Sequence, residues 1–491
     1  MLTVFFYSLP FLFTVGVAFG VAVLGFLQYR LAARVLPETR VMAAVLIIGI
    51  GALLSVVLTS RTLDETKIST GLIVTYDDYA GGFAASRWLS LLLIGASLIE
   101  IARGWVRGRA IQLPDPAQPI LFALLAYYLG TIAIQGVASD VPGFSFRSLY
   151  VPLVLVAGYY QQPKTLKPIL SAARWALFAL LAGSLLAIWL RPDFVMHQPD
   201  PGSIPGINWR LFGLTPHANT LGPIALLAIV IELHAPWQWN LMRWANLLCA
   251  AAVLLLAQSK TAWAAALALM AVVYLPLALR RAVNVTGPSS RFNRTVWILL
   301  GSLVLMCLFV GTFVAFDVFE FIQRRGDLAS LTGRTNIWEI TLQAWEQNKL
   351  FGYGPEIWGP ERQLRFHMFH VGHAHNQAVQ TLGEAGLVGL WLLLAYVGTL
   401  LLSALRIFVA SRGFVLLLLL LMLVRCVTEA PMRGEGLLSW ATFLHLLLLV
   451  VACHYVRGTG PRAMVGLLTR PASVRGGPGA GHDMRLASRE C

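Results

Sequence analysis

The stretch from His373 to Arg406, HAHNQAVQTLGEAGLVGLWLLLAYVGTLLLSALR, decides how the rest of the chain is interpreted. It begins where the longest polar segment ends, and it passes into an apolar run at 386–406. A run of that length can cross the ~30 Å hydrocarbon core of a bilayer as one helix. The sequence therefore predicts a membrane helix with polar, chemically active residues immediately before it.

Apolar runs of this kind recur along the whole chain. Of its 491 residues, 57% are hydrophobic and only 12% are charged, whereas soluble proteins carry roughly 25% charged residues. About thirteen blocks stand out, and the number becomes twelve if one N-terminal block is drawn wrongly. They lie near 4–27, 41–59, 88–102, 118–138, 147–161, 168–190, 219–234, 241–258, 261–279, 296–316, 386–406, 413–428 and 438–455. This pattern predicts an all-α polytopic membrane protein with about 12–13 transmembrane helices.

The distribution of charge predicts the orientation of these helices. The formal net charge is +14, but the basic residues do not gather on one soluble segment as they do in nucleic-acid-binding proteins. They lie in short loops between the blocks and in the tail, which is the pattern of the positive-inside rule. The long loops 60–87, 191–218 and 317–385, with short turns near 139–146, 259–260 and 429–437, then share the opposite face.

Five segments follow from this topology. We expect N-terminal transmembrane helices in 1–190, central helices with a polar loop around Arg210 in 191–316, and a large external loop in 317–385. C-terminal helices occupy 386–456, and 457–491 is a basic, disordered cytoplasmic tail. Within the large loop, Trp338, Leu342 and Trp345 recur at helical spacing. That spacing predicts an amphipathic helix from 335 to 348, lying on the membrane surface.

The first candidate for chemistry is His375, which with Asn376 precedes the apolar run containing Gly386 and Gly389. Imidazole exchanges a proton near neutral pH, so a histidine at a membrane boundary suits general base catalysis. Glycines three residues apart would let a neighbouring helix or lipid chain approach closely. In the alternative interpretation, His375 only caps or orients a loop.

Two arginines are expected on the same face as His375. Arg210 begins the segment Arg210-Leu-Phe-Gly213 that continues to His217 and Asn219, and Arg334 precedes Trp338. Guanidinium groups bind phosphate through a planar fork of donors and stay charged beside lipid. The pair could therefore clamp a lipid-linked diphosphate, with Lys260 and Arg147 as further phosphate ligands. Alternatively, the arginines pair with loop carboxylates at Asp193, Glu356 or Glu384.

A metal site is the competing interpretation of the histidines. His367, His370, His373 and His375 are close in sequence, and imidazole is a common zinc ligand. Their spacing is loose, and no cysteine or acidic residue lies close by in the sequence. We therefore expect no metal, and we assign His373 to substrate binding.

Taken together, these elements resemble the O-antigen ligase/polymerase superfamily of bacterial inner-membrane glycan transferases, and within it the O-antigen ligases. The signature His-[Asn/Ser/Gln]-x9-Gly-x-x-Gly is met by His375, Asn376, Gly386 and Gly389. The element Arg-x-x-Gly with a downstream Asn is similar to Arg210, Gly213 and Asn219, and Gly-Arg…Trp is similar to Gly333, Arg334 and Trp338. The likeness covers roughly 200–410, and the remainder by topology only.

The resemblance implies a GT-C-like, metal-independent glycosyltransferase without a cofactor, in the bacterial inner membrane with its active site facing the periplasm. Its donor would be undecaprenyl-diphosphate-linked O-antigen and its acceptor lipid A–core, in lipopolysaccharide biosynthesis. His375 would act as general base in an inverting transfer, and Arg210 and Arg334 would neutralise the leaving diphosphate. The remaining residues assigned to substrate binding are Asn376, Asn219, His217, Trp338, Lys260, Arg147 and His373.

Other functions are compatible with the same residues. An O-antigen polymerase or a protein O-oligosaccharyltransferase of this superfamily would share the histidine and glycine signature. A small-anion transporter is a different class, which should carry ionisable residues deep in several helices. Here the mid-helix charges are few, with Glu100, Arg174 and Glu232 as the candidates.

Overall fold

The computed structural model describes residues 36–59, 61–64, 84–109, 115–199, 204, 206–269, 332–368, 371–434 and 436–459. Within these ranges the regular structure is helical apart from one small antiparallel pair, β1 (Met196–His197) with β2 (Arg210–Leu211). The prediction of an all-α protein is confirmed.

Among the described residues, six helices are long and apolar enough to cross a membrane. They are α2 (Pro37–Val57), α4 (Ala84–Arg109), α5 (Gln118–Val137), α7 (Lys167–Leu190), α15 (Gln377–Arg406) and α17 (Trp440–Gly458). Three shorter apolar helices accompany them, α9 (Ala218–His234), α10 (Asn240–Leu256) and α16 (Phe414–Thr428), together with α6 (Tyr150–Gln161). A helical run at 260–269 covers the start of block 261–279. The chain is a multi-pass membrane protein; the predicted blocks 4–27 and 296–316 lie outside the described residues.

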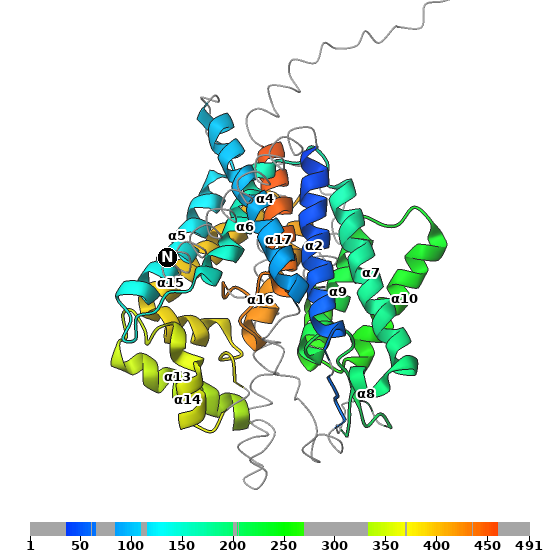
Figure 1. Ribbon diagram of the computed structural model, residues 1–491. Helices are drawn as coiled ribbons and strands as arrows, with labels where there is room; N and C mark the ends of the chain where they lie inside the picture. The colour runs from blue at the N-terminus through cyan, green and yellow to red at the C-terminus, as the bar shows by residue number, and fades with distance from the viewer. Residues whose placement is uncertain are drawn as a thin grey trace, which may run out of the picture.

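Helices α16 and α17 form the centre of the bundle (Figure 1). α16 packs against α9, α15 and α17, and α17 also contacts α2 and α6. The run from Leu416 to Leu421 in α16 is buried at every position. A helix that is apolar all round is expected where neighbouring helices surround it. These two helices therefore fix the positions of the outer ones, including α15.

The polar connections collect at one end of this bundle, which we call the loop end. It holds α8 (Pro192–Val195), the β1–β2 pair, α13 (Thr332–Gln347), η3 (Pro355–Trp358) and α14 (Pro360–Arg365). In Figure 1 these elements lie at the bottom, α13 and α14 on the left and α8 on the right. Backbone hydrogen bonds tie the segments, since Leu63 N donates to Asp193 O and Asp140 N donates to Gly352 O. η2 (Phe146–Leu149) lies at the same end.

The expected amphipathic helix is present as α13, which packs against α15. In contrast, the predicted start of the next membrane helix, at residue 386, is wrong. α15 begins at Gln377, inside the segment assigned to the external loop, and its backbone breaks at Gly386 (φ 63°, ψ −160°). Beyond the break, Leu387 N donates to Lys349 O and Val388 N to Leu350 O. The turn after α13 is thus inserted into the break in α15.

Gly386 makes this insertion possible, which differs from the role expected for it. An added Cβ would collide with the carbonyl oxygen of Leu350, so the element that approaches Gly386 is a backbone turn and not a membrane helix. Its positive φ also favours glycine, because a side chain there is strained. Gly389 faces α5, where an added Cβ would lie 3.7 Å from the methyl group of Thr131.

We expect Gly386→Ala to destabilise the protein by about 2 to 4 kcal/mol, from the strained φ and the collision with Leu350. Thermal unfolding of the detergent-solubilised protein would measure this effect. Gly398→Ala is the matched control, because it lies in the same helix and an added Cβ there meets no atom within 4 Å. Equal unfolding temperatures for the two variants would contradict the assigned role of Gly386.

Candidate functional site

The histidine loop, residues 373–376, is held by the start of α15, the end of α16 and the middle of α13. Asn376 is the N-cap of α15, where its Oδ1 accepts hydrogen bonds from Ala378 N (3.0 Å) and Val379 N (3.1 Å). Its Nδ2 donates to the carbonyl of Val427 in the last turn of α16 (3.2 Å). Asn376 therefore joins the start of α15 to the end of α16, and both its Oδ1 and its Nδ2 form hydrogen bonds.

The backbone of Ala374, two residues before Asn376, is fixed by side chains of α13 and α15. The indole Nε1 of Trp338 donates to the carbonyl of Ala374 (2.8 Å), and Gln380 Oε1 accepts from Ala374 N (2.5 Å). Trp338 lies in α13, so the amphipathic helix is coupled directly to the loop that carries both histidines. This contact explains physically why a tryptophan so far upstream belongs to the same site.

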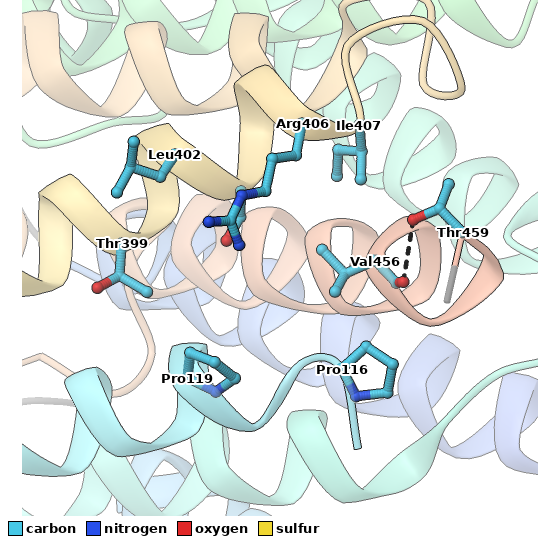
Figure 2. Close-up of a pocket in the computed structure, with 9 residues that line it drawn as sticks. Pro116, Pro119, Thr399, Leu402, Arg406, Ile407, Val456 and Thr459 are labelled. Carbon is cyan, nitrogen blue, oxygen red and sulfur yellow. Dashed lines mark hydrogen bonds between the residues drawn. The ribbon is translucent and has the colours of Figure 1, made fainter. Parts of the chain in front are cut away.

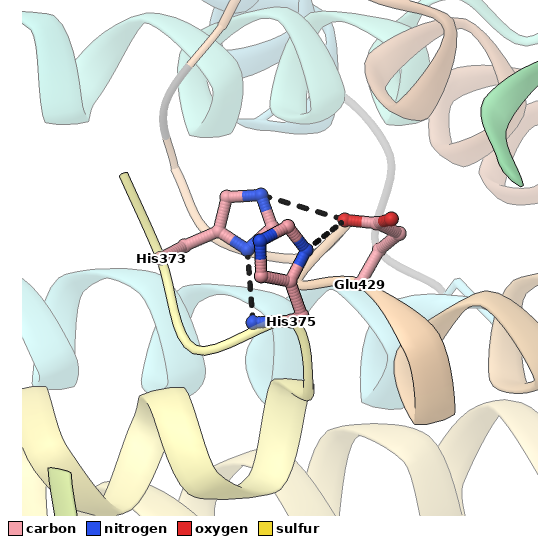
Figure 3. A group of neighbouring side chains, drawn as sticks. All are labelled: His373, His375 and Glu429. Carbon is pink, nitrogen blue, oxygen red and sulfur yellow. Dashed lines mark hydrogen bonds and ion pairs between the residues drawn. The ribbon is translucent and has the colours of Figure 1, made fainter. Parts of the chain in front are cut away.

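The side chains of His373, His375 and Glu429 meet in front of this loop (Figure 3). His375 Nδ1 lies 3.2 Å from Glu429 Oε2, and His373 Nε2 lies 3.4 Å from the same oxygen. Burial alone would raise the pKa of Glu429, but the hydrogen bond and charge of His375, with the charges of His373 and His217, lower that pKa to about 2. Glu429 is therefore a carboxylate at neutral pH.

Arg210, at the loop end, is held by two hydrogen bonds. Its Nη2 donates to Asn219 Oδ1 (3.2 Å) and its Nε to the carbonyl of Ala257 (3.4 Å). The Arg210 loop is in turn anchored by the buried Arg61, which donates to the carbonyls of Thr215 (2.7 Å) and Gly213 (2.5 Å). Asn219 thus orients the guanidinium of Arg210.

His217 connects the arginines to the histidine loop. It is the N-cap of α9, and its Nδ1 accepts from Asn219 N (3.1 Å). Desolvation lowers the pKa of His217 to about 4; the charge of Glu429 opposes this shift, while Arg210, Arg334 and His375 add to it. The charges of all four groups therefore act on this ring.

The other predicted residues are distributed around this cluster. Arg334 lies in the first turn of α13, and its charge acts on both His217 and His373. No described residue forms a hydrogen bond or ion pair with its guanidinium. Lys260 opens the helical run 260–269 and Arg147 lies in η2; both are exposed, and no ion pair joins either to the histidine loop within the described ranges. The predicted pairing partner Glu384 is bound by Arg433 (2.7 Å).

Sequence reasoning missed two charged residues of α16. Glu429, its C-cap, is 54 residues from His375, and no local pattern connects them. Arg425 is buried in the last turn, and its Nε and Nη1 have no partner among the described residues. An arginine inside an apolar block is costly in a membrane and is therefore a signal of function or of a specific partner. That signal was available for Arg425 in block 413–428.

The trio could in principle hold a cation, because the ligand atoms of His373, His375 and Glu429 all lie within 4.8 Å of one another. No acidic residue lies close to these histidines in the sequence, but folding brings Glu429 to them, so the premise on which no metal is expected is wrong. His367 is exposed in the turn after α14, and His370 lies outside the described residues. The 3.2 Å separation of His375 and Glu429 is an ordinary hydrogen bond length.

A separate cavity lies at the opposite end of the bundle, and Figure 2 shows the residues that line it. Its volume is about 450 Å³, and it is lined by residues at the start of α5 and the ends of α15 and α17, among them Pro119, Arg406 and Thr459. The histidine loop precedes the first turn of α15, whereas Arg406 is its last residue. This cavity is therefore not part of the candidate site.

Fold and site together define a multi-pass membrane protein with a cationic, histidine-containing site at one end of its helical bundle. Residues 245–394 match the family described as O-antigen ligase. This match supports membership of the O-antigen ligase/polymerase superfamily over that part of the chain. The matched range includes Arg334, His375 and the signature glycines, but neither Arg210 nor Glu429. No curated protein matches the chain.

The lowered pKa of His217 predicts a loss of stability on acidification. The unfolded chain, with a pKa near 6.5, takes up this proton before the folded protein does. The contribution is complete above pH 6.5 and is lost as the pH falls through about 4. We expect His217→Gln to reduce the loss of unfolding free energy between pH 7 and 5 by about 1 to 2 kcal/mol.

Thermal unfolding at several pH values would measure this change, with His367→Gln, which removes an exposed imidazole, as the matched control. A wild-type dependence on pH in His217→Gln would show that the ring does not contribute in this way.

Proposed function

We propose that the protein is an O-antigen ligase of the bacterial inner membrane. In this proposal it transfers a glycan from undecaprenyl diphosphate to an outer-core sugar of lipid A–core, with the loop end facing the periplasm. The superfamily membership supports the reaction class. The apolar helices support a lipid-linked donor, because a site at the end of the bundle lies at the depth of lipid headgroups.

The observation that carries the proposal is the state of the His375 ring. Its Nδ1 is bound by Glu429, its side chain is 31% exposed, and no described residue bonds to its Nε2. His373 differs, since its Nδ1 accepts from His375 N (3.0 Å) and its Nε2 faces Glu429. His217 uses its Nδ1 as a helix cap. Of the three rings, His375 is therefore the one suited to accept a proton from substrate.

The chemistry follows from this arrangement. His375 Nε2 takes the proton of an acceptor hydroxyl while that oxygen forms a bond to the anomeric carbon of the donor sugar. The bond from this carbon to the diphosphate breaks on the opposite face, so the configuration is inverted. Arg210 and Arg334 neutralise the negative charge that develops on the departing diphosphate. The N-terminus of α9, beside Arg210, adds a favourable dipole for the same anion.

Substrate binding is assigned from the remaining contacts. Lys260 follows Ala257, the acceptor for Arg210 Nε, and Arg147 lies close to the turn after α16; both are exposed cations suited to phosphate groups of donor or acceptor. Asn376, Asn219, Trp338 and His373 orient the reacting groups through the hydrogen bonds described above. Neither a metal nor a nucleotide is required by this scheme.

A transporter is less well supported by the buried charges. Glu100 pairs with Arg40 (3.0 Å), Glu232 accepts from Asn246 (2.9 Å), and Arg174 donates to the carbonyl of Ala235. These charges are held by structural partners within the described residues. O-antigen polymerase and protein O-oligosaccharyltransferase share the donor, so only the acceptor separates them from a ligase.

We expect His375→Ala to lower the rate of transfer by at least about 100-fold, because no other group at the site accepts the proton. The purified protein would be supplied with lipid-diphosphate glycan and either lipid A–core or a second donor molecule, and the product would be analysed on a gel. His454→Ala, at the opposite end of the bundle, is the matched control.

Product on lipid A–core identifies a ligase, and lengthening of the glycan on the donor identifies a polymerase. Wild-type transfer by His375→Ala would contradict the role of the base.

We expect Arg210→Ala and Arg334→Ala each to lower kcat by about 100- to 1,000-fold, since each removes a donor from the leaving group. The Lys variants should recover only part of the rate, because an ammonium group cannot replace the planar fork. Arg365→Ala, on exposed α14, is the matched control. Rates within twofold of wild type in both Ala variants would count against the clamp.

A further inference from the structure

We propose that Glu429 is a positioning residue that holds the proton of His375 on Nδ1 and thereby presents Nε2 to the acceptor hydroxyl. This inference rests on the proposed role of His375 as the base. It adds a residue that lies outside the family match and outside every sequence motif considered above.

The position of Glu429 suits this role. It is the C-cap of α16, and its backbone N–H donates to Arg425 O (2.8 Å), so the central helix fixes its backbone. Its side chain is 13% exposed, whereas those of His373 and His375 are 32% and 31% exposed. The carboxylate is therefore more buried than either ring, and it reaches both of them (Figure 3).

The nitrogen that carries the proton in each ring follows from the hydrogen-bond partners of that ring. A carboxylate only accepts hydrogen bonds, so the ring nitrogen that bonds to Glu429 must carry the proton. In His375 this is Nδ1, which leaves the lone pair on Nε2. In His373, Nδ1 accepts the backbone N–H of His375, so its proton is on Nε2, facing the same carboxylate oxygen. Glu429 thus sets the tautomer of His375, with His373 packed beside it.

The loop itself does not fix the ring of His375. His375 has a positive φ of 48°, a conformation that side-chain-bearing residues adopt at a cost and that clusters at functional sites. The loop backbone is held by Trp338 and Gln380 at Ala374. Among the described residues, the side chain forms one hydrogen bond beyond its own loop, to Glu429, so this carboxylate sets the orientation of the ring.

The carboxylate also offsets the charge formed in the reaction. When the acceptor O–H bond breaks, the proton moves to Nε2 and His375 becomes an imidazolium, while the hydroxyl electrons form the new C–O bond. Arg334 and Arg433 both act on the neighbouring His373, so a further positive charge here is opposed by cations. Glu429 lies in contact with the new imidazolium and stabilises it, as the buried aspartate does in a catalytic triad.

The test compares Glu429→Gln, Glu429→Asp and Glu429→Ala with Glu346→Gln, an exposed glutamate of α13. For each purified variant, kcat and the KM of donor and acceptor would be measured, together with the temperature of thermal unfolding. We expect kcat of Glu429→Gln to fall by about 10- to 100-fold and that of Glu429→Ala by about 100- to 1,000-fold. Both KM values should stay within about twofold of wild type, and Glu429→Asp should recover part of kcat.

Three outcomes would overturn the inference. The first is an unchanged kcat in Glu429→Gln while His375→Ala is inactive, which leaves the proposed base intact and rejects its partner. The second is a fall in kcat accompanied by equal rises in both KM values and a lower unfolding temperature, which indicates a structural role. The third is wild-type activity that is abolished by EDTA and restored by Zn²⁺, since Glu429 would then be a metal ligand.

Activity in His375→Ala would instead reject the proposed function itself, and the inference with it.

Discussion

Helix ends at the edge of a bilayer leave backbone N–H and C=O groups that need partners, and the site is built from the residues at those ends. His217 is the N-cap of α9, Asn376 is the N-cap of α15, and Glu429 is the C-cap of α16. Each of these residues also touches or flanks a group assigned to the chemistry. Capping therefore fixes the three helix ends at one level and brings their side chains together, so the geometry of the site is a consequence of how the bundle ends.

The fold was predictable because a membrane imposes a simple length rule on the sequence. Apolar blocks gave the helices, and charge asymmetry grouped the long loops at one end. The role of Gly386 was not predictable in the same way. Its spacing to Gly389 suggested helix packing, whereas the turn at Leu350 occupies the break in α15. Glycine in a membrane helix serves either purpose, and only the position of the distant turn decides between them.

The candidate site was predictable only where a residue type is distinctive and locally patterned. His375, Arg210 and Arg334 stood out as polar residues beside apolar blocks, and the charges of all three act on His217. Glu429 did not stand out, because a glutamate at the end of an apolar block reads as an ordinary loop residue. Its partner is 54 residues away, and that contact exists only after α16 packs against α15. A residue that acts through a distant side chain is not marked by a local pattern in a single sequence.

The charges that develop during the proposed transfer explain why a carboxylate, Glu429, lies in a site proposed to bind an anion. In the proposed transfer, negative charge grows on the diphosphate while positive charge grows on the imidazole, on opposite sides of the sugar. Arginines alone would stabilise the first charge and oppose the second. They would also repel one another in the empty protein, where neighbouring lipid and protein screen charges poorly. Glu429, with its pKa held at about 2 by the surrounding histidines, stays ionised in both situations. This one partly buried carboxylate thus offsets the neighbouring positive charges before the donor arrives and keeps His375 able to accept a proton once the donor is bound.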